Sequence, residues 1–121
     1  MITLKQADGR DAEMEAQRHL QKKGYRLLDA NYQTPLGEVD LVMEKGTTVV
    51  FVEVRKRRSG GYGTAADSVT KKKQDRVGRA AMMYVKSKFL VGRNLRFDVV
   101  AIQGTTLNHI ENAFVPTQYT I

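Results

Sequence analysis

The sequence predicts one α/β domain over residues 1–121, with the element order αβββαββ and a mixed central sheet flanked by helices. Two segments carry apolar residues at helical spacing, and five carry the composition or alternation of β-strands. A chain of 121 residues is long enough to bury one core and too short for two. With 41% hydrophobic and 27% charged residues, the composition is that of a folded chain and excludes wholesale disorder.

The first helix is expected over residues 12–23. Gly24 follows it, at the position after a helix end where a left-handed backbone conformation is favoured. At 100° per residue, Glu13 lies beside Leu20 at the edge of the apolar stripe. Glu13 is therefore either a solvated edge residue, which is the commoner case, or one member of a site.

Three strands follow this helix. Residues 25–32 have β-compatible side chains, and residues 34–37 break the chain before the next strand. Residues 38–44 alternate between apolar and mostly acidic positions, whereas residues 48–55 are apolar on both faces until their end. The last of these strands is therefore expected at the centre of the sheet.

The turn between the second and third strands predicts their register. Residues 45–48 can form a type II′ turn with Gly46 at its first central position. Counting outwards from this turn places Asp40 opposite Glu53. If the turn lies one residue earlier, Glu38 faces Glu53 and the acids still share one face, whereas a three-residue loop would separate Asp40 from Glu53.

The second half of the chain runs from a basic loop to a helix and then to two strands. Residues 55–63 form a basic, glycine-rich loop. Residues 70–88 have a buried stripe at helical spacing, with five basic side chains in their first turns. Residues 95–102 and 105–114 are expected to form the last two strands.

Composition restricts the chemistry. The chain has no Cys and two distant His residues, so a metal would be held mainly by oxygen, which favours hard cations such as Mg²⁺ or Mn²⁺. The net charge of +7 is typical of a protein that meets a polyanion, although charge alone can simply aid solubility. No apolar run approaches the roughly 18 residues of a membrane span, and no secretory leader follows Met1. We therefore expect a cytoplasmic protein with no membrane partner.

The acidic residues of the strands are in costly positions. Like charges that face each other across a sheet repel, and burial adds a desolvation penalty. A surface hairpin neutralised by Arg55 and Lys56 is the alternative interpretation. It fits poorly, because Glu53 interrupts an apolar strand and Asp40 alternates with hydrophobic residues. With Glu13 nearby, we predict that Asp40 and Glu53 bind Mg²⁺ or Mn²⁺, which can polarise a phosphodiester and activate water.

Four blocks of the sequence resemble the YraN-like family of small endonuclease-like proteins: GEVDL at 37–41, VFVEVR at 50–55, TKKKQ at 70–74 and RFDVV at 96–100. That family belongs to the PD-(D/E)XK, or restriction-endonuclease-like, superfamily and is similar to archaeal Holliday-junction resolvases. The similarity spans nearly the whole chain, and its specificity lies in the order of the blocks. It implies a restriction-endonuclease-like fold.

The resemblance also implies a set of site residues. The acidic members of a nuclease site would be Glu13, Asp40 and Glu53. Gln74 would approach that site from the second helix, and Arg55 stands where the superfamily has its catalytic Lys. Arg stays charged but cannot lose a proton. Lys73, beside Gln74, could instead supply an ammonium group.

Basic residues gather in the loop after the third strand and at the start of the second helix, where they would flank the acidic site. A run of Lys and Arg is usually a solvated segment, and one Tyr is weak support for base stacking. We nevertheless predict phosphate or base contacts. The predicted nucleic-acid-binding residues are Arg55, Lys56, Arg57, Arg58, Tyr62, Lys71, Lys72, Lys73, Arg76 and Arg79.

These observations predict a metal-dependent phosphodiesterase, or nuclease, that acts on DNA, with branched DNA as one candidate substrate. The alternative is a catalytically weak or inactive nucleic-acid-binding module that keeps the nuclease fold. A protein-interaction adaptor ranks last, because it needs neither the acidic cluster nor the basic rim. Junction resolvases act as symmetric dimers, so a homodimer is one candidate for the oligomeric state.

Overall fold

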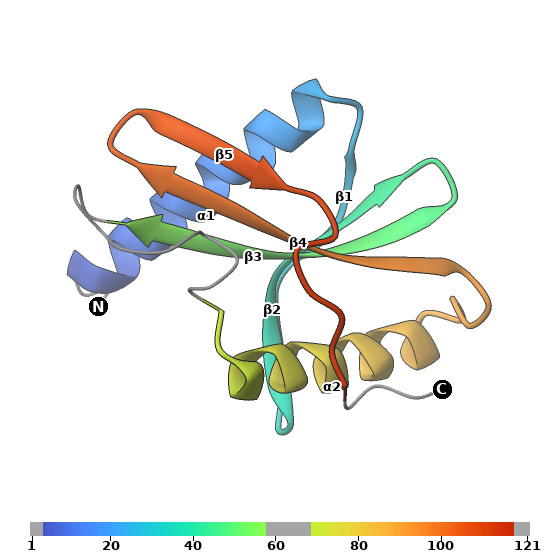
Figure 1. The fold of residues 1–121 in the computed structure, drawn as a ribbon. Helices are drawn as coiled ribbons and strands as arrows, with labels where there is room; N and C mark the ends of the chain where they lie inside the picture. The colour runs from blue at the N-terminus through green and yellow to red at the C-terminus, as the bar shows by residue number, and fades with distance from the viewer. Residues whose placement is uncertain (1–3, 58–68, 118–121) are drawn as a thin grey trace.

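A computed structural model describes residues 4–57 and 69–117 of the chain. Within these ranges the elements follow the predicted order αβββαββ (Figure 1). They are α1 (Leu4–Lys22), β1 (Arg26–Thr34), β2 (Gly37–Lys45), β3 (Thr48–Arg57), α2 (Lys71–Ser87), β4 (Asn94–Gln103) and β5 (Thr106–Ile110). None of the helices in the described ranges has the length and apolar character needed to cross a membrane.

The strands form a five-stranded sheet in the order β1-β2-β3-β4-β5, with β3 at its centre as predicted. β3 and β4 are parallel, whereas each of the other neighbouring pairs is antiparallel. Parallel neighbours need a crossover connection, and α2 lies between β3 and β4 in the chain. The mixed α/β sheet expected of a restriction-endonuclease-like domain is therefore confirmed.

The two helices cover opposite faces of the sheet, each over its own core. Successive residues of a strand point to opposite faces, so β3 contributes to both cores. Phe51 packs with Val77 and Tyr84 of α2, and Val52 packs with Leu20 of α1. The apolar character of β3 on both faces follows from this position between two helices.

Helix α1 begins at Leu4, so the start predicted at residue 12 is wrong. Ala12 is buried and the two residues before it are exposed, so the apolar stripe marks only the part of α1 that packs on the sheet. The helix ends at Lys22, one residue before the predicted end, and Gly24 closes it as predicted. Gly24 has a φ of 90°, and the Tyr25 N–H donates to the Leu20 carbonyl at 3.1 Å, which closes a Schellman-type end.

The β2–β3 hairpin has the predicted turn, and its pairing follows the predicted register as far as Leu41 and Val52, one pair short of Asp40 and Glu53. Lys45 pairs with Thr48, Gly46 has a φ of 59°, and Val42 lies opposite Phe51. A positive φ at the first central position is what a type II′ turn requires. The chain order and this turn therefore bring the acidic residues of β2 and β3 to the same region of the sheet.

Strand β5 ends at Ile110, so the strand predicted to run to residue 114 is too long. Asn112 has a φ of 52°, and its N–H donates to a carboxylate oxygen of Asp98 at 2.9 Å. This bond, and the one that the Ala113 N–H donates to the Phe97 carbonyl at 2.8 Å, tie the residues after β5 to β4.

Candidate functional site

The sheet opens between β2 and β3 beyond the pair Leu41 and Val52. Their ladder stops there, although β2 stays paired with β1 to its first residue and β3 stays paired with β4 to its last. Beyond this pair the two strands therefore diverge (Figure 1). Asp40 and Glu53 are the first residues beyond the ladder, one on each side of the opening.

Side chains replace the missing ladder at this opening. Asp40 Oδ2 accepts a hydrogen bond from the Val54 N–H at 2.8 Å, and the Glu53 carboxylate accepts one from the backbone of Asp40. Glu53 is only 1% exposed, and among the described residues its Oε1 has no hydrogen-bond partner. A buried carboxylate oxygen without a donor is unfavourable, so this atom is available to a ligand.

The pKa values of the three acids are all raised. Burial, followed by repulsion from Asp40, raises the pKa of Glu53 to about 8, against the opposing charge of Lys73. Burial also raises the pKa of Asp40 above its ordinary value. For Glu13, burial and the charge of Asp40 raise the pKa to about 7, and Glu13 donates a hydrogen bond to Asp40. The acidic cluster therefore retains protons at neutral pH and favours added positive charge.

The stability of the metal-free protein should respond to these groups. The folded-state pKa values of Glu13 and Glu53 lie above their unfolded value of 4.5, so the folded state binds more protons between about pH 4.5 and 8. Their contribution to the unfolding free energy must fall as pH rises through this window. Urea unfolding across this range should show a steeper loss for wild type than for Glu53→Gln. If the unfolding free energies of the two proteins changed with pH in parallel, the assigned burial of Glu53 would be contradicted.

Helix α2 brings Lys73 to the same opening. Thr70 caps the helix, because its hydroxyl oxygen accepts a hydrogen bond from the Lys73 N–H at 3.2 Å. Lys73 lies one turn before Val77, on the stripe of α2 that packs on the sheet. Its Nζ is 3.7 Å from Glu53 Oε2 and 3.8 Å from Glu38 Oε1.

The other two predicted catalytic residues are Arg55 on β3 and Gln74 on α2. Arg55 follows Glu53 by two residues on β3. The positive charges of Lys73 and Arg55 both lower the pKa of Glu53, and Lys73 has the larger effect. Gln74 is partly buried, and its amide nitrogen donates to the Val69 carbonyl at 2.9 Å. In the structure this bond ties the first turn of α2 to the residue before its cap.

The acids do not form a complete cage for a metal ion. The part of the chain that the structure describes contains no group of three acidic or histidine side chains arranged to hold a cation. Glu13 instead shares its proton with Asp40. The predicted metal ligands are therefore confined to Asp40 and Glu53, with Glu13 as a hydrogen-bond partner of one of them.

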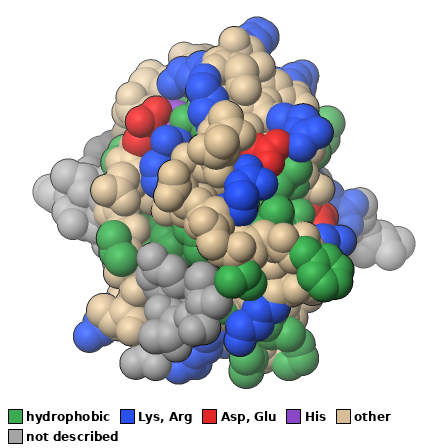
Figure 2. Space-filling model, turned by 90° about the vertical axis from the view of Figure 1, so that its right-hand side faces the viewer, with side chains coloured by type: hydrophobic (Ala, Val, Ile, Leu, Met, Phe, Trp, Pro, Cys, Tyr) green, Lys and Arg blue, Asp and Glu red, His purple; other side chains and the backbone are tan. Residues whose placement is uncertain are grey.

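The predicted nucleic-acid-binding residues fall into three groups. Arg58 and Tyr62 lie outside the described residues, and Arg55, Lys56 and Arg57 end β3. On α2, Lys73 faces the acids, whereas four basic side chains are exposed: Lys71, Lys72, Arg76 and Arg79. Lys and Arg side chains also spread over the side of the molecule drawn in Figure 2, with few acidic ones between them.

Two neighbours of the site were not among the predicted site residues. Glu38 pairs with Lys73, and Gly37 packs against α2 so closely that a Cβ atom there would lie 2.1 Å from the Arg76 carbonyl oxygen. Both residues begin the GEVDL block. The spacing of Lys73 before Val77 was a further signal, because it distinguishes Lys73 from the exposed lysines of the same helix.

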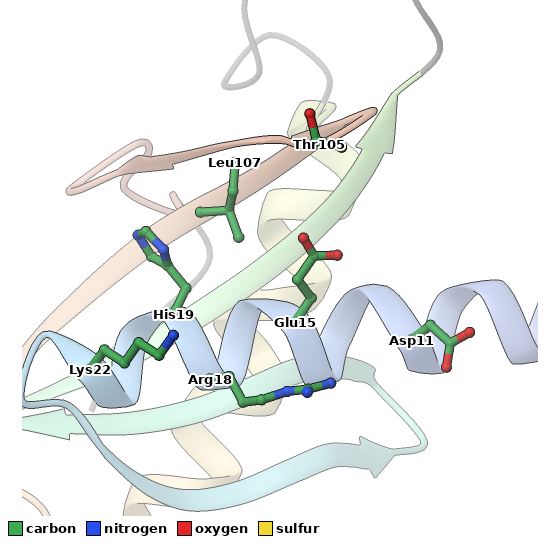
Figure 3. Close-up of a pocket in the computed structure, with 7 residues that line it drawn as sticks. All are labelled: Asp11, Glu15, Arg18, His19, Lys22, Thr105 and Leu107. Atoms are coloured by element: carbon green, nitrogen blue, oxygen red, sulfur yellow. The ribbon is translucent and has the colours of Figure 1, made fainter.

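A cavity of about 580 Å³ lies elsewhere, between α1 and the hairpin of β4 and β5. In Figure 3, Glu15 and His19 point from α1 toward the hairpin that carries Thr105 and Leu107. The described residues that line it include none of the predicted site residues, and they carry both signs of charge. The acidic opening of the sheet, which combines buried carboxylates with a nearby ammonium, is therefore the stronger candidate.

Comparison with known proteins agrees with the sequence blocks. A family model described as "Uncharacterised protein family UPF0102" matches residues 12–102, which include both strands of the opening and Lys73. The chain belongs to the UPF0102 family. The predicted resemblance to the YraN-like family is thereby confirmed.

Close relatives support the UPF0102 assignment along nearly the full length. A UPF0102 protein of Desulfosudis oleivorans is 43% identical over 116 residues, covering 94% of each chain. One of Herminiimonas arsenicoxydans is 45% identical over 111 residues, covering 92% of this chain and 89% of the relative. One of a Sulfurihydrogenibium species is 40% identical over 106 residues, covering 88% and 92%.

Proposed function

We propose that this UPF0102 protein is a metal-dependent phosphodiesterase that cleaves DNA. The observation that carries the proposal is the pair of carboxylates at the opening between β2 and β3. Asp40 and Glu53 come together there, one oxygen of Glu53 is buried without a partner among the described residues, and the Lys73 ammonium lies 3.7 Å from Glu53. Opposite charges placed side by side suit a reaction that needs both a cation site and an anion site.

The residues present fit a hard divalent cation. Carboxylate oxygens are the ligands that Mg²⁺ and Mn²⁺ prefer, and the unpartnered Glu53 Oε1 is such an oxygen. Asp40 and Glu53 would hold the ion. Bound there, it would polarise a phosphodiester and lower the pKa of an attacking water.

The chain's own side chains supply the remaining functions. Glu13 donates a hydrogen bond to Asp40 and so orients that carboxylate. The cationic groups of Arg55 and Lys73 offset the charge of the reacting phosphate. The exposed basic residues of α2 contact neighbouring phosphates, which carry most of the affinity of a protein for DNA.

The net charge and the resemblance to junction resolvases support DNA as the substrate. A net charge of +7 and four exposed cations on α2 beside the acids favour a polyanionic substrate. The resemblance to junction resolvases makes branched DNA the first form to test. A second candidate is a binding module with little or no turnover, which is favoured by one observation: Arg55 stands where the superfamily has its catalytic Lys.

A cleavage assay decides between these two functions. Plasmid, single-stranded, flap and four-way-junction DNA are incubated with the protein and Mg²⁺, Mn²⁺ or a chelator, and Asp40→Asn serves as the matched control. We expect the wild-type protein to cleave at least one form of DNA when Mg²⁺ or Mn²⁺ is present. We expect no cleavage with the chelator or by Asp40→Asn. Tight DNA binding without cleavage under any condition would replace the phosphodiesterase by the binding module.

Binding to duplex DNA should depend strongly on salt. A footprint of about 4 to 6 phosphates predicts a slope of log affinity against log salt near 4 to 5 in magnitude. Replacing Lys72, Arg76 and Arg79 by Gln should lower that magnitude by about 3, because three phosphate contacts are lost. The matched control replaces Arg18, Lys22 and Lys23, three exposed cations at the end of α1. Equal slopes for the two triple variants would disprove the α2 interface.

A further inference from the structure

We propose that Lys73, rather than Arg55, is the cation that contacts the reacting phosphate, and that Gly37 is the positioning residue that sets its place. This inference rests on the phosphodiesterase proposed above. It assigns the catalytic cation to helix α2 rather than to β3.

The geometry of Lys73 suits this role. Its side chain leaves the buried stripe of α2 and reaches the carboxylates of Glu38 and Glu53, yet it keeps 29% of its surface exposed. Its Nζ distances of 3.8 and 3.7 Å to these two acids exceed hydrogen-bond range. The ammonium is thus held by charge, while its N–H donors are not used by either carboxylate and can turn to a phosphate oxygen.

Arg55 approaches from a different element. It lies two residues beyond Glu53 on β3, and positions two apart on a strand share a face. Of the two cations, Lys73 acts more strongly on Glu53. An ammonium is also a compact point charge that fits between two carboxylates. Lys73 therefore lies within 3.8 Å of two of the acids at the opening, Glu38 and Glu53.

Gly37 controls the distance between Lys73 and the acids. A Cβ atom at Gly37 would lie 2.1 Å from the carbonyl oxygen of Arg76 and 2.7 Å from its carbon. Arg76 follows Lys73 by three residues on the same helix, and Glu38, which pairs with Lys73, follows Gly37 directly. The bare backbone of Gly37 thus lets α2 approach β2. An alanine would force the helix away by about 1 Å and carry Lys73 with it.

The first test needs no cleavage. The protein is treated with a lysine-methylating reagent, alone and with Ca²⁺ and phosphorothioate DNA of the form that binds most tightly, and each lysine is quantified by mass spectrometry. We expect DNA to protect Lys73 by about fivefold or more, while Lys22 on α1 stays unprotected. Equal modification of Lys73 with and without DNA overturns the inference, and so does a failure to bind any DNA.

The second test is kinetic. Lys73→Met should lower kcat by about 10²- to 10³-fold with DNA affinity little changed, since a charge-stabilising donor acts mainly in the transition state. Lys73→Arg should restore part of the rate, and Arg55→Met should cost less than about tenfold. Gly37→Ala should lower kcat by about tenfold or more without weakening DNA binding.

A destabilised control separates positioning from folding. Gly104→Ala strains a residue with a φ of 61° at the β4–β5 turn, where a Cβ meets nothing within 4 Å. It should reduce stability and keep kcat. A Lys73→Met protein as active as wild type, or a larger loss for Arg55→Met, overturns the inference while the phosphodiesterase stands. A wild-type protein that cuts no DNA removes the phosphodiesterase, and the protection of Lys73 then decides the contact alone.

Discussion

Glu53→Gln should make the metal-free protein more stable and the metal-loaded protein inactive. In wild type a carboxylate with 1% exposure lies beside Asp40, and its ionisation is opposed by burial and by like charge. A neutral amide of the same shape removes that repulsion. We expect the unfolding free energy at about pH 8 to rise by about 1 to 3 kcal/mol, and cleavage to fall by about 10³-fold or more.

The matched control for this variant is Glu15→Gln. Glu15 is an exposed acid on α1, so the same change of charge there should leave both stability and cleavage nearly unchanged. Urea unfolding and the DNA cleavage assay measure the two effects. A Glu53→Gln protein that is less stable than wild type would show that Glu53 is a structural residue, and one that cleaves normally would remove it from the site.

The largest loss of stability is expected from Asp98→Ala. Asp98 is fully buried and accepts hydrogen bonds from Arg96, from His109 at 2.7 Å and from the N–H of Asn112. Removing the carboxylate leaves a partly buried guanidinium and a buried imidazole without their acceptor. Breaking a buried pair in this way costs about 3 to 5 kcal/mol.

Urea unfolding of Asp98→Ala measures this cost, with Asp11→Ala as an exposed control. A loss below about 1 kcal/mol would contradict the assigned network. Burial alone would raise the pKa of Asp98, but the hydrogen bonds from His109 and Arg96 outweigh it and hold the pKa below the usual 3.8. This contribution is present above that value and is lost as pH falls below it, which is opposite in sign to the contribution of Glu53.

The hairpin register could be predicted because one short turn determines it. A glycine at the first central position of a two-residue turn fixes which residues face each other, and the apolar run of β3 indicates a central strand. The register predicted that Asp40 and Glu53 lie close together, and in the structure the Glu53 carboxylate accepts a hydrogen bond from the backbone of Asp40. The end of the ladder just before them could not be predicted, because alternation along a strand carries no information on where its neighbour departs.

The departure of β2 also changes which core its residues join. Alternation places Val39, Leu41 and Met43 on one face, but Val39 packs with Val42 in the core under α2. That assignment of Val39 was wrong. The strict period of two fails where the strand changes its partners, and this is the position of the candidate site.

Tertiary contacts account for the other features that sequence patterns did not show. The tight packing of Gly37 on α2 depends on a residue nearly forty positions away. Asp98 has the same sequence pattern as Glu53, because both are acids within an apolar strand. Its hydrogen bonds with Arg96 and His109 nevertheless give Asp98 a structural role. The same sequence pattern therefore has two outcomes: Asp98 lies in a network of hydrogen bonds, whereas Glu53 has an oxygen without a partner among the described residues.

Titration of Mn²⁺ into the metal-free protein, followed by calorimetry, tests the central claim most directly. Wild type and a control variant, Asp11→Asn with Glu15→Gln, should each bind one ion per chain. The Asp40→Asn, Glu53→Gln protein, which carries the same change of charge at the opening of the sheet, should bind none. Equal Mn²⁺ affinity in all three proteins would contradict the assignment of Asp40 and Glu53 as the cation site.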